Sequence, residues 1–130
     1  MAYSVGKGIR LMKNNSDRLF LLSGDDYFLQ TFFISKLSEY NNNNYKTTYL
    51  NLEEDSDIKV LLNEMYSTSL FPSKNLFIVR NFSKISNKDK NEITLYLNKP
   101  KNDLIIVFIY EDYYAKNSFL NILSNKTQHI

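Results

Sequence analysis

Short apolar runs divide the chain into alternating strand and helix segments. Continuous runs occur at Leu19 to Leu22, Leu76 to Val79 and Leu104 to Ile109. Runs this short that are apolar on both faces and rich in Ile, Val and Phe are typical of parallel strands covered by helices on either side. A fourth run, Lys46 to Leu52, is more polar, which predicts a strand nearer the edge of the sheet.

The segments between these strands carry apolar residues at helical spacing. The first helix is expected to end at the Asn41 to Asn44 run, because Asn competes for helix hydrogen bonds and tolerates left-handed backbone. The apolar stripes that predict four helices are Leu29, Phe33, Leu37 and Tyr40; Ile58, Leu61, Leu62 and Met65; Ile93, Tyr96 and Leu97; and Phe119, Leu120 and Leu123.

Polar residues and a proline indicate where two of these helices begin and end. Asp55 or Ser56 is predicted to cap the second helix by accepting hydrogen bonds from its first-turn amides. The third helix is predicted to begin near Ser86 or Asn87 and to end before Pro100, because the residue before a proline disfavours helical backbone.

The alternation of strands and helices predicts an α/β domain with a three-layer open parallel sheet. The length of 130 residues fits a single domain over residues 1–130. Residues 126–130 predict the start of a fifth strand. Val5 to Met12 predict a short additional helix, which Gly6 and Gly8 disfavour.

Composition excludes several kinds of site. The chain has no Cys and a single His, His129, which removes disulfides, thiolate zinc sites and histidine-dependent triads. A net charge of +2 does not by itself indicate nucleic-acid binding. No apolar run reaches about 18 residues and no signal peptide is visible, so we expect a soluble, cytoplasmic protein without a membrane partner.

The residues that follow each strand are the first place to look for chemistry, because ligands of parallel sheets bind beyond the carboxyl ends of the strands. After the first strand come Gly24, Asp25 and Asp26, at the position of a phosphate-binding loop. A working loop needs several glycines and a Lys, but here the next Lys is Lys36 and the two carboxylates repel phosphate. The simpler interpretation of the two acids is favourable charge at a helix amino terminus.

After the strand at 76–79 come Arg80 and Asn81, where an ATPase of this architecture carries acidic residues that hold magnesium. Both halves of a hydrolytic site are therefore missing. We predict a degenerate nucleotide site, with no cofactor, no metal ion and no intrinsic catalysis.

A second hypothesis makes the chain a magnesium- or nucleotide-dependent phosphotransfer domain. Its ligands are Asp25 and Asp26 together with Glu111 and Asp112, which follow the strand at 104–109. Such a site normally adds an Asp after another central strand. Acids in surface turns are more often only solvated.

A third hypothesis is single-stranded DNA binding by basic residues, with Tyr96 or Tyr110 as stacking surfaces. A solvated helix face explains the same charges. The basic residues concerned are Arg80, Lys84, Lys88, Lys90, Lys99 and Lys101.

Leu70 and Phe71 interrupt a polar connection between the second helix and the strand at 76–79, and Pro72 fixes the turn that follows them. They either anchor the loop under the sheet or form an exposed wedge that fills a pocket on a partner. The physics of the sequence leaves these two interpretations open. We call the Leu70-Phe71 pair the wedge.

Three segments together resemble a known family: LFLLSGDDYFL at 19–29, SLFPSKNLFIVRN at 69–81 and NDLIIVFIYED at 102–112. In this order and spacing, the chain from about residue 17 to residue 130 resembles the amino-terminal domain of the delta subunit of bacterial DNA polymerase III clamp loaders. The resemblance implies an AAA+-like domain, related to P-loop NTPases, with a five-stranded parallel sheet that has lost its ATPase motifs.

The resemblance also implies a role for the wedge. In the family, the leucine and phenylalanine of a Ser-Leu-Phe motif enter a hydrophobic pocket on the sliding clamp, the beta subunit, and help the ring to open. Ser69, Leu70 and Phe71 match this motif, while Pro72 stands where a small or turn-forming residue is usual.

The resemblance further implies the partners of the whole protein. They are the sliding clamp, the other clamp-loader subunits, which bind ATP, and DNA only through the assembled DNA polymerase III holoenzyme. Lid and collar domains of the family do not fit into 130 residues. We therefore expect this chain to bind a clamp but not to join or operate a loader alone.

Overall fold

The protein is seen here as a computed structural model that describes residues 18–24, 27–40, 45–67, 74–101, 103–110, 119, 123 and 128–129. Strands and helices alternate as the apolar runs predict. The elements are β1 (Leu19–Ser23), α2 (Tyr27–Tyr40), β2 (Lys46–Asn51), α3 (Asp55–Met65), β3 (Asn75–Arg80), α4 (Asn87–Asn98), β4 (Leu104–Tyr110) and β5 (Gln128–His129).

The strands form one parallel sheet in the order β2-β3-β4-β1-β5. In the register, Leu21 of β1 lies opposite Phe108 of β4, and Phe77 of β3 lies opposite Ile106. The predicted parallel α/β fold is confirmed for the four longer strands. β5 is a two-residue segment beside β1, so a full fifth strand over 126–130 stays a prediction.

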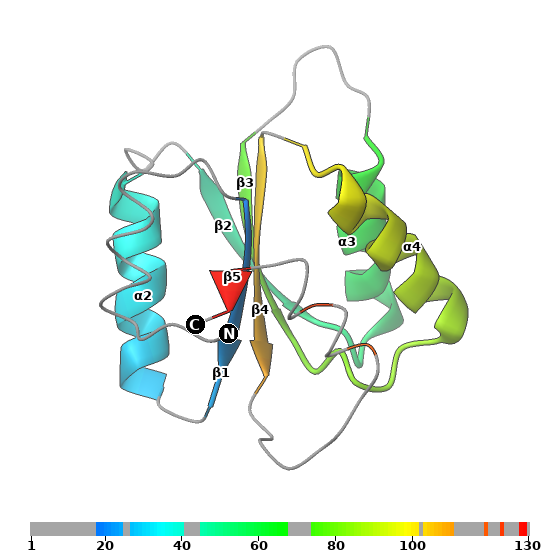
Figure 1. Cartoon of the computed structure of the whole chain (residues 1–130), viewed down its shortest axis with the longest axis horizontal. Helices are drawn as coiled ribbons and strands as arrows, with labels where there is room; N and C mark the ends of the chain where they lie inside the picture. The colour runs from blue at the N-terminus through cyan, green and yellow to red at the C-terminus, as the bar shows by residue number, and fades with distance from the viewer. Residues whose placement is uncertain are drawn as a thin grey trace.

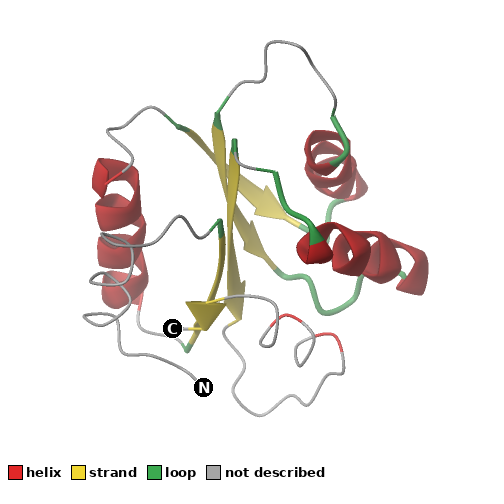
Figure 2. Cartoon of the chain, turned by 45° about the horizontal axis from the view of Figure 1, so that its top comes forward, coloured by secondary structure: helices red, strands yellow, loops and turns green. Residues whose placement is uncertain are grey.

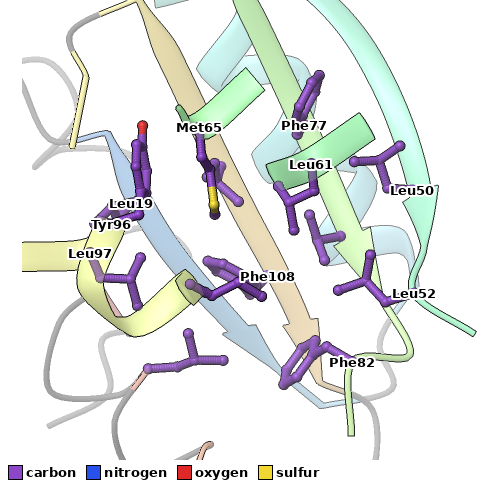
Figure 3. Packing of buried hydrophobic residues seen from close by; sticks show 14 of the residues in the cluster. Leu19, Leu50, Leu52, Leu61, Met65, Phe77, Phe82, Tyr96, Leu97 and Phe108 are labelled. Carbon is purple, nitrogen blue, oxygen red and sulfur yellow. The ribbon is translucent and has the colours of Figure 1, made fainter. Parts of the chain in front are cut away.

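Helices cover both faces of the sheet, with α2 on one face and α3 and α4 on the other (Figures 1 and 2). Each face has its own apolar core because β3 and β4 bury side chains on both sides. On the α3 and α4 side, Phe108 and Phe82 pack edge to face, with their ring centroids 5.8 Å apart (Figure 3). The two buried layers explain why these strands read as continuous apolar runs.

The apolar stripe of α2 differs from the predicted stripe by one position. Phe33 and Leu37 are buried as expected, but Leu29 is 40 % exposed and Gln30, which is polar, is only 6 % exposed. At 3.6 residues per turn, position 30 shares the core-facing side of the helix with 33 and 37, whereas position 29 lies on its flank. A buried glutamine must have hydrogen-bond partners, and they are described below.

The helix boundaries confirm the predicted limits of α4 and correct the predicted cap of α3. Ser86 caps α4, its hydroxyl accepting a hydrogen bond from the amide of Asp89 (3.2 Å), and α4 ends at Asn98, before Pro100. The predicted cap of α3 at Asp55 or Ser56 is wrong, because the helix already begins at Asp55 with Glu54 in the capping position. No side chain caps this helix, and none of the helices in the described part is long and apolar enough to cross a membrane.

Candidate functional site

The parallel sheet has an amino edge and a carboxyl edge. The strand arrows all point the same way in Figure 1, so the amino ends of the strands share one edge and the carboxyl ends share the other. The segment with the wedge connects α3 to β3 and therefore belongs to the amino edge. Ser69, Leu70, Phe71 and Pro72 lie outside the described residues, but the structure describes the stems on both sides of them.

The first stem, at the end of α3, is held by α4. The hydroxyl group of Tyr66 donates a hydrogen bond to the backbone oxygen of Glu92. The ring of Tyr66 packs edge to face on that of Tyr96, with centroids 6.2 Å apart. The amide of Tyr66 also donates to the oxygen of Leu62 (3.2 Å), which keeps this stem in the last turn of α3.

The second stem, at the start of β3, is held by its neighbours in the sheet. The amide of Asn75 donates to the backbone oxygen of Asp103 (3.1 Å), and the oxygen of Lys74 accepts from the amide of Lys46 (2.9 Å). The ammonium group of Lys74 lies 6.0 Å from the centroid of the Tyr45 ring, within the range of a cation–π interaction.

Lys101 connects the two stems. Its ammonium group donates a 2.7 Å hydrogen bond to the backbone oxygen of Glu64, near the end of α3. The same group lies 3.5 Å from the carboxylate of Glu64 and 3.8 Å from that of Asp103, whose backbone holds Asn75. A cation at a helix carboxyl terminus is favourable because the last carbonyl groups carry partial negative charge.

Tyr96 supports Lys101 from the core. Its hydroxyl oxygen accepts a hydrogen bond from the amide of Lys101 (3.1 Å). Burial raises the pKa of Tyr96 to about 12, and the charges of Asp103 and Glu64 act in the same direction, while the hydrogen bond from Lys101 lowers it. The phenol therefore stays neutral at physiological pH. Burial and the charge of Glu92 likewise raise the pKa of Tyr66.

At the carboxyl edge, internal hydrogen bonds engage Gly24, which lies where a phosphate loop would begin. Gly24 has φ of 115°, which favours glycine because a side chain clashes in this region. Its amide donates to the oxygen of Tyr110 (2.9 Å), and its oxygen accepts from the side-chain amide of Gln30 (2.8 Å). The amide of Gly24 is thus already engaged.

Arg80 occupies the end of β3, and its side chain contacts two residues of α2. Its guanidinium donates a long hydrogen bond to the side-chain oxygen of Gln30 (3.4 Å) and lies 5.6 Å from the centroid of the Tyr27 ring. Asn81 follows with φ of 58°, a left-handed conformation that Asn tolerates, and donates to the side-chain oxygen of Asn51 (3.0 Å). Neither residue offers a carboxylate to a metal ion.

The acidic residues of the phosphotransfer hypothesis, Asp25, Asp26, Glu111 and Asp112, lie outside the described residues. Among the residues that the structure describes, no group of three His, Cys, Asp or Glu side chains is placed to hold a metal ion. The phosphotransfer hypothesis stays a prediction from the sequence.

The hypothesis of single-stranded DNA binding loses its stacking surfaces. Tyr96 and Tyr110 are both buried, because they pack in the core on the α3 and α4 side of the sheet. The basic residues also separate: Arg80 ends β3 and Lys84 follows it at the carboxyl edge, whereas Lys99 precedes β4 at the amino edge. They do not form one groove.

Sequence reasoning missed the Lys101 cluster. Lys101 was grouped with solvated or phosphate-binding lysines, although Glu64 and Asp103 take part in its site. The only local signal was the spacing of Lys101 and Asp103, and the contact with Glu64 joins positions far apart in the chain. Gln30 was missed for the same reason.

Two solved structures are similar to this chain in fold. A DNA polymerase III gamma subunit-related protein from Thermotoga maritima superposes with a TM-score of 0.63 at 14 % identity, over 98 % of this chain and 45 % of that one. PCH-2 from C. elegans superposes with a TM-score of 0.52 at 14 % identity, over 95 % of this chain and 37 % of that one. This chain therefore spans less than half the length of either protein.

No protein-family model matches the sequence, and neither does any curated protein. At 14 % identity the structural likeness shows the fold alone. That fold is an α/β fold with a parallel sheet covered by helices on both faces (Figure 1).

Proposed function

We propose that this chain acts in bacterial DNA replication as a delta-type clamp-loader domain, which binds the sliding clamp through the wedge and helps to open the ring. The observation that carries the proposal is the position of the Ser69-Leu70-Phe71 motif between α3 and β3 of a clamp-loader-like fold. The likeness to a DNA polymerase III gamma subunit-related protein supports the fold, and the resemblance of the three sequence segments supports the role.

The wedge has the size of a binding hot spot. Burying a leucine and a phenylalanine in a pocket removes enough apolar surface for roughly 3 to 6 kcal/mol of gross stabilisation. Ring opening then follows from differential binding: a wedge that prefers a spread clamp interface shifts the clamp toward the open state by that preference alone.

The stems favour this role because they present the wedge from a fixed base. Tyr66 holds one end of the segment against α4, and Asn75 holds the other end in the sheet. Lys101 contacts Glu64 on the first side and Asp103 on the second. Fixing the ends of a binding segment lowers the entropy lost on association, so a short wedge binds more tightly than on a free loop.

The proposal includes no hydrolysis of ATP by this domain. The amide of Gly24 is engaged with Tyr110, and Arg80 stands at the end of β3 where a carboxylate would hold magnesium. We assign ATP binding to other subunits of the loader, contact with DNA to the assembled complex, and the protein itself to the bacterial cytoplasm. In the family that the sequence resembles, assembly with those subunits belongs to the carboxy-terminal collar domain.

Clamp binding by the isolated chain tests the proposal. On a biosensor carrying the sliding clamp encoded by the same genome, wild type should bind and Leu70→Ala/Phe71→Ala should lose binding while keeping its circular dichroism spectrum. The matched control is Tyr49→Ala/Leu95→Ala, which removes two exposed apolar side chains from other surfaces (66 and 67 % exposed). The control should bind like wild type.

Two results speak against the proposal. Equal losses of binding in both double variants contradict a specific wedge. A rise in melting temperature with magnesium or a nucleotide, by mass action, favours the phosphotransfer hypothesis instead.

A further inference from the structure

Charge is distributed unevenly between the two edges of the sheet. Basic residues precede or begin the four longer strands: Arg18, Lys46, Lys74 and, before β4, Lys99 and Lys101. Acidic pairs follow three of these strands in the sequence, at positions 25–26, 53–54 and 111–112. A net charge of +2 therefore hides a positive amino edge, the edge to which the wedge segment belongs.

Two of these lysines are exposed at the starts of adjacent strands, and a third is exposed at the carboxyl end of α4. Lys46 begins β2, Lys74 precedes β3 and Lys99 lies in the connection that leads to β4. β2 and β3 are neighbours in the sheet, and Lys46 lies opposite Asn75, the residue that follows Lys74. We call Lys46, Lys74 and Lys99 the basic rim. Lys74 stands three residues after Phe71, so the rim adjoins the wedge segment.

The basic rim is not neutralised by the described residues. Near the amino edge, the carboxylate of Glu39 pairs with Lys36 at 3.4 Å, and those of Glu64 and Asp103 pair with Lys101. Within the described part of the chain, no ion pair involves Lys46, Lys74 or Lys99. Their charge faces solvent, or a partner.

We propose that the basic rim binds an acidic protein surface that surrounds the apolar pocket taken by the wedge, and that its charge speeds association. This inference rests on the proposed clamp-binding function and names the chemistry of the clamp surface around the pocket. Complementary charge at the border of an interface steers encounter and register more than it adds affinity. The rim therefore acts mainly on the association rate, and the wedge on the dissociation rate.

An acidic protein suits this edge better than DNA does. Three lysines neutralise only about three phosphates, which gives weak binding at physiological salt. Binding of single strands also depends on aromatic stacking, and three tyrosines described near this edge are already engaged. Tyr96 is buried, Tyr45 lies beneath Lys74, and Tyr66 packs on Tyr96 and donates a hydrogen bond to Glu92.

Association rates at several salt concentrations test the inference. The rim variant is Lys46→Gln/Lys74→Gln/Lys99→Gln. Its control is Lys59→Gln/Lys84→Gln/Lys88→Gln, which makes the same change in net charge at exposed positions away from the amino edge. At about 50 mM salt we expect the rim variant to associate with the clamp roughly tenfold more slowly, with a flatter salt dependence. The control should associate at nearly the wild-type rate.

Each contrary result identifies which statement fails. If both variants associate equally slowly with the clamp, the effect comes from net charge alone and the basic rim has no specific role. If the rim variant keeps the salt dependence of wild type, the basic rim has no role in association. Clamp binding through the wedge is still supported in that case if Leu70→Ala/Phe71→Ala abolishes binding. Loss of oligonucleotide binding in the rim variant, with clamp association unchanged, assigns the edge to nucleic acid instead. A wild-type chain that fails to bind the clamp even at low salt removes the proposed function itself.

Discussion

Replacing Lys101 by methionine should destabilise the whole domain, although lysines are usually solvated. Methionine keeps the apolar stem of the side chain and removes its charge. The change deletes the 2.7 Å hydrogen bond to the oxygen of Glu64 and leaves the carboxylates of Glu64 and Asp103 without their cation. The three side chains are only about one-fifth exposed, at 21, 22 and 18 %.

The expected loss follows from these contacts. A hydrogen bond from a charged donor contributes about 1.5 to 3 kcal/mol, and each of the two longer ion pairs adds at most about 1 kcal/mol. We therefore expect Lys101→Met to lower the free energy of unfolding by about 2 to 3 kcal/mol. For a domain of this size that corresponds to a fall in melting temperature of roughly 8 to 12 °C.

Urea unfolding followed by circular dichroism measures this loss, with Lys99→Met as the control. Lys99 is exposed and lies two residues away, so its replacement should change stability by less than about 0.5 kcal/mol. Hydrogen exchange supplies a local readout: in Lys101→Met the amide of Asn75 should exchange faster, while that of Leu52, bonded to Arg80, should lose less protection. Equal stabilities of the two variants would refute the reasoning.

Three further perturbations probe the core, a backbone conformation and a titrating group. Phe108→Ala should lower the free energy of unfolding by about 3 to 5 kcal/mol in urea titrations, because the ring is fully buried. The control Val60→Ala, at an exposed position, should change the free energy of unfolding by less than about 1 kcal/mol relative to wild type. Similar small losses in both variants would contradict the packing of Phe108. Asn81→Gly should be more stable than Asn81→Ala by about 1 kcal/mol in the same assay, because both variants lose the side-chain hydrogen bond but only alanine is strained at φ of 58°. If Asn81→Ala were the more stable variant, the backbone at position 81 would not be left-handed. The free energy of unfolding should fall by up to about 1.4 kcal/mol per pH unit between pH 10 and 12, because the pKa of Tyr96 is about 12 in the fold and 10.0 ordinarily, so the unfolded chain loses this proton first. Denaturant midpoints measured across this pH range should fall less steeply in Tyr96→Phe than in wild type. Parallel curves for the two proteins would refute the assignment.

The sequence was sufficient for the strands because their signal is local. A strand buried on both faces must be apolar at every position, so the run at 104–109 identifies β4 to within one residue. The start of α4 near Ser86 was predictable for a similar reason, because the partner of its cap, Asp89, lies three residues away.

Features that depend on distant partners were not predictable from one sequence. Gln30 is buried because it bridges Gly24 and Arg80, and Arg80 lies fifty positions further along the chain. Lys101 is held by Glu64, which is separated from it by the whole of β3 and α4. A polar residue is expected at the surface unless its partners are known, so nothing in the sequence indicated that either side chain is held by the fold.

Photo-crosslinking from the wedge to the clamp tests the central claim most directly. A photoreactive benzoylphenylalanine is placed at position 71, replacing Phe71, and in a separate variant at position 95, replacing the exposed Leu95 of α4. Both variants are irradiated with the sliding clamp. We predict a crosslinked product with the clamp from position 71 and little or none from position 95. Absence of a product from position 71, or equal yields from the two positions, would contradict the assignment of the wedge as the clamp-binding element.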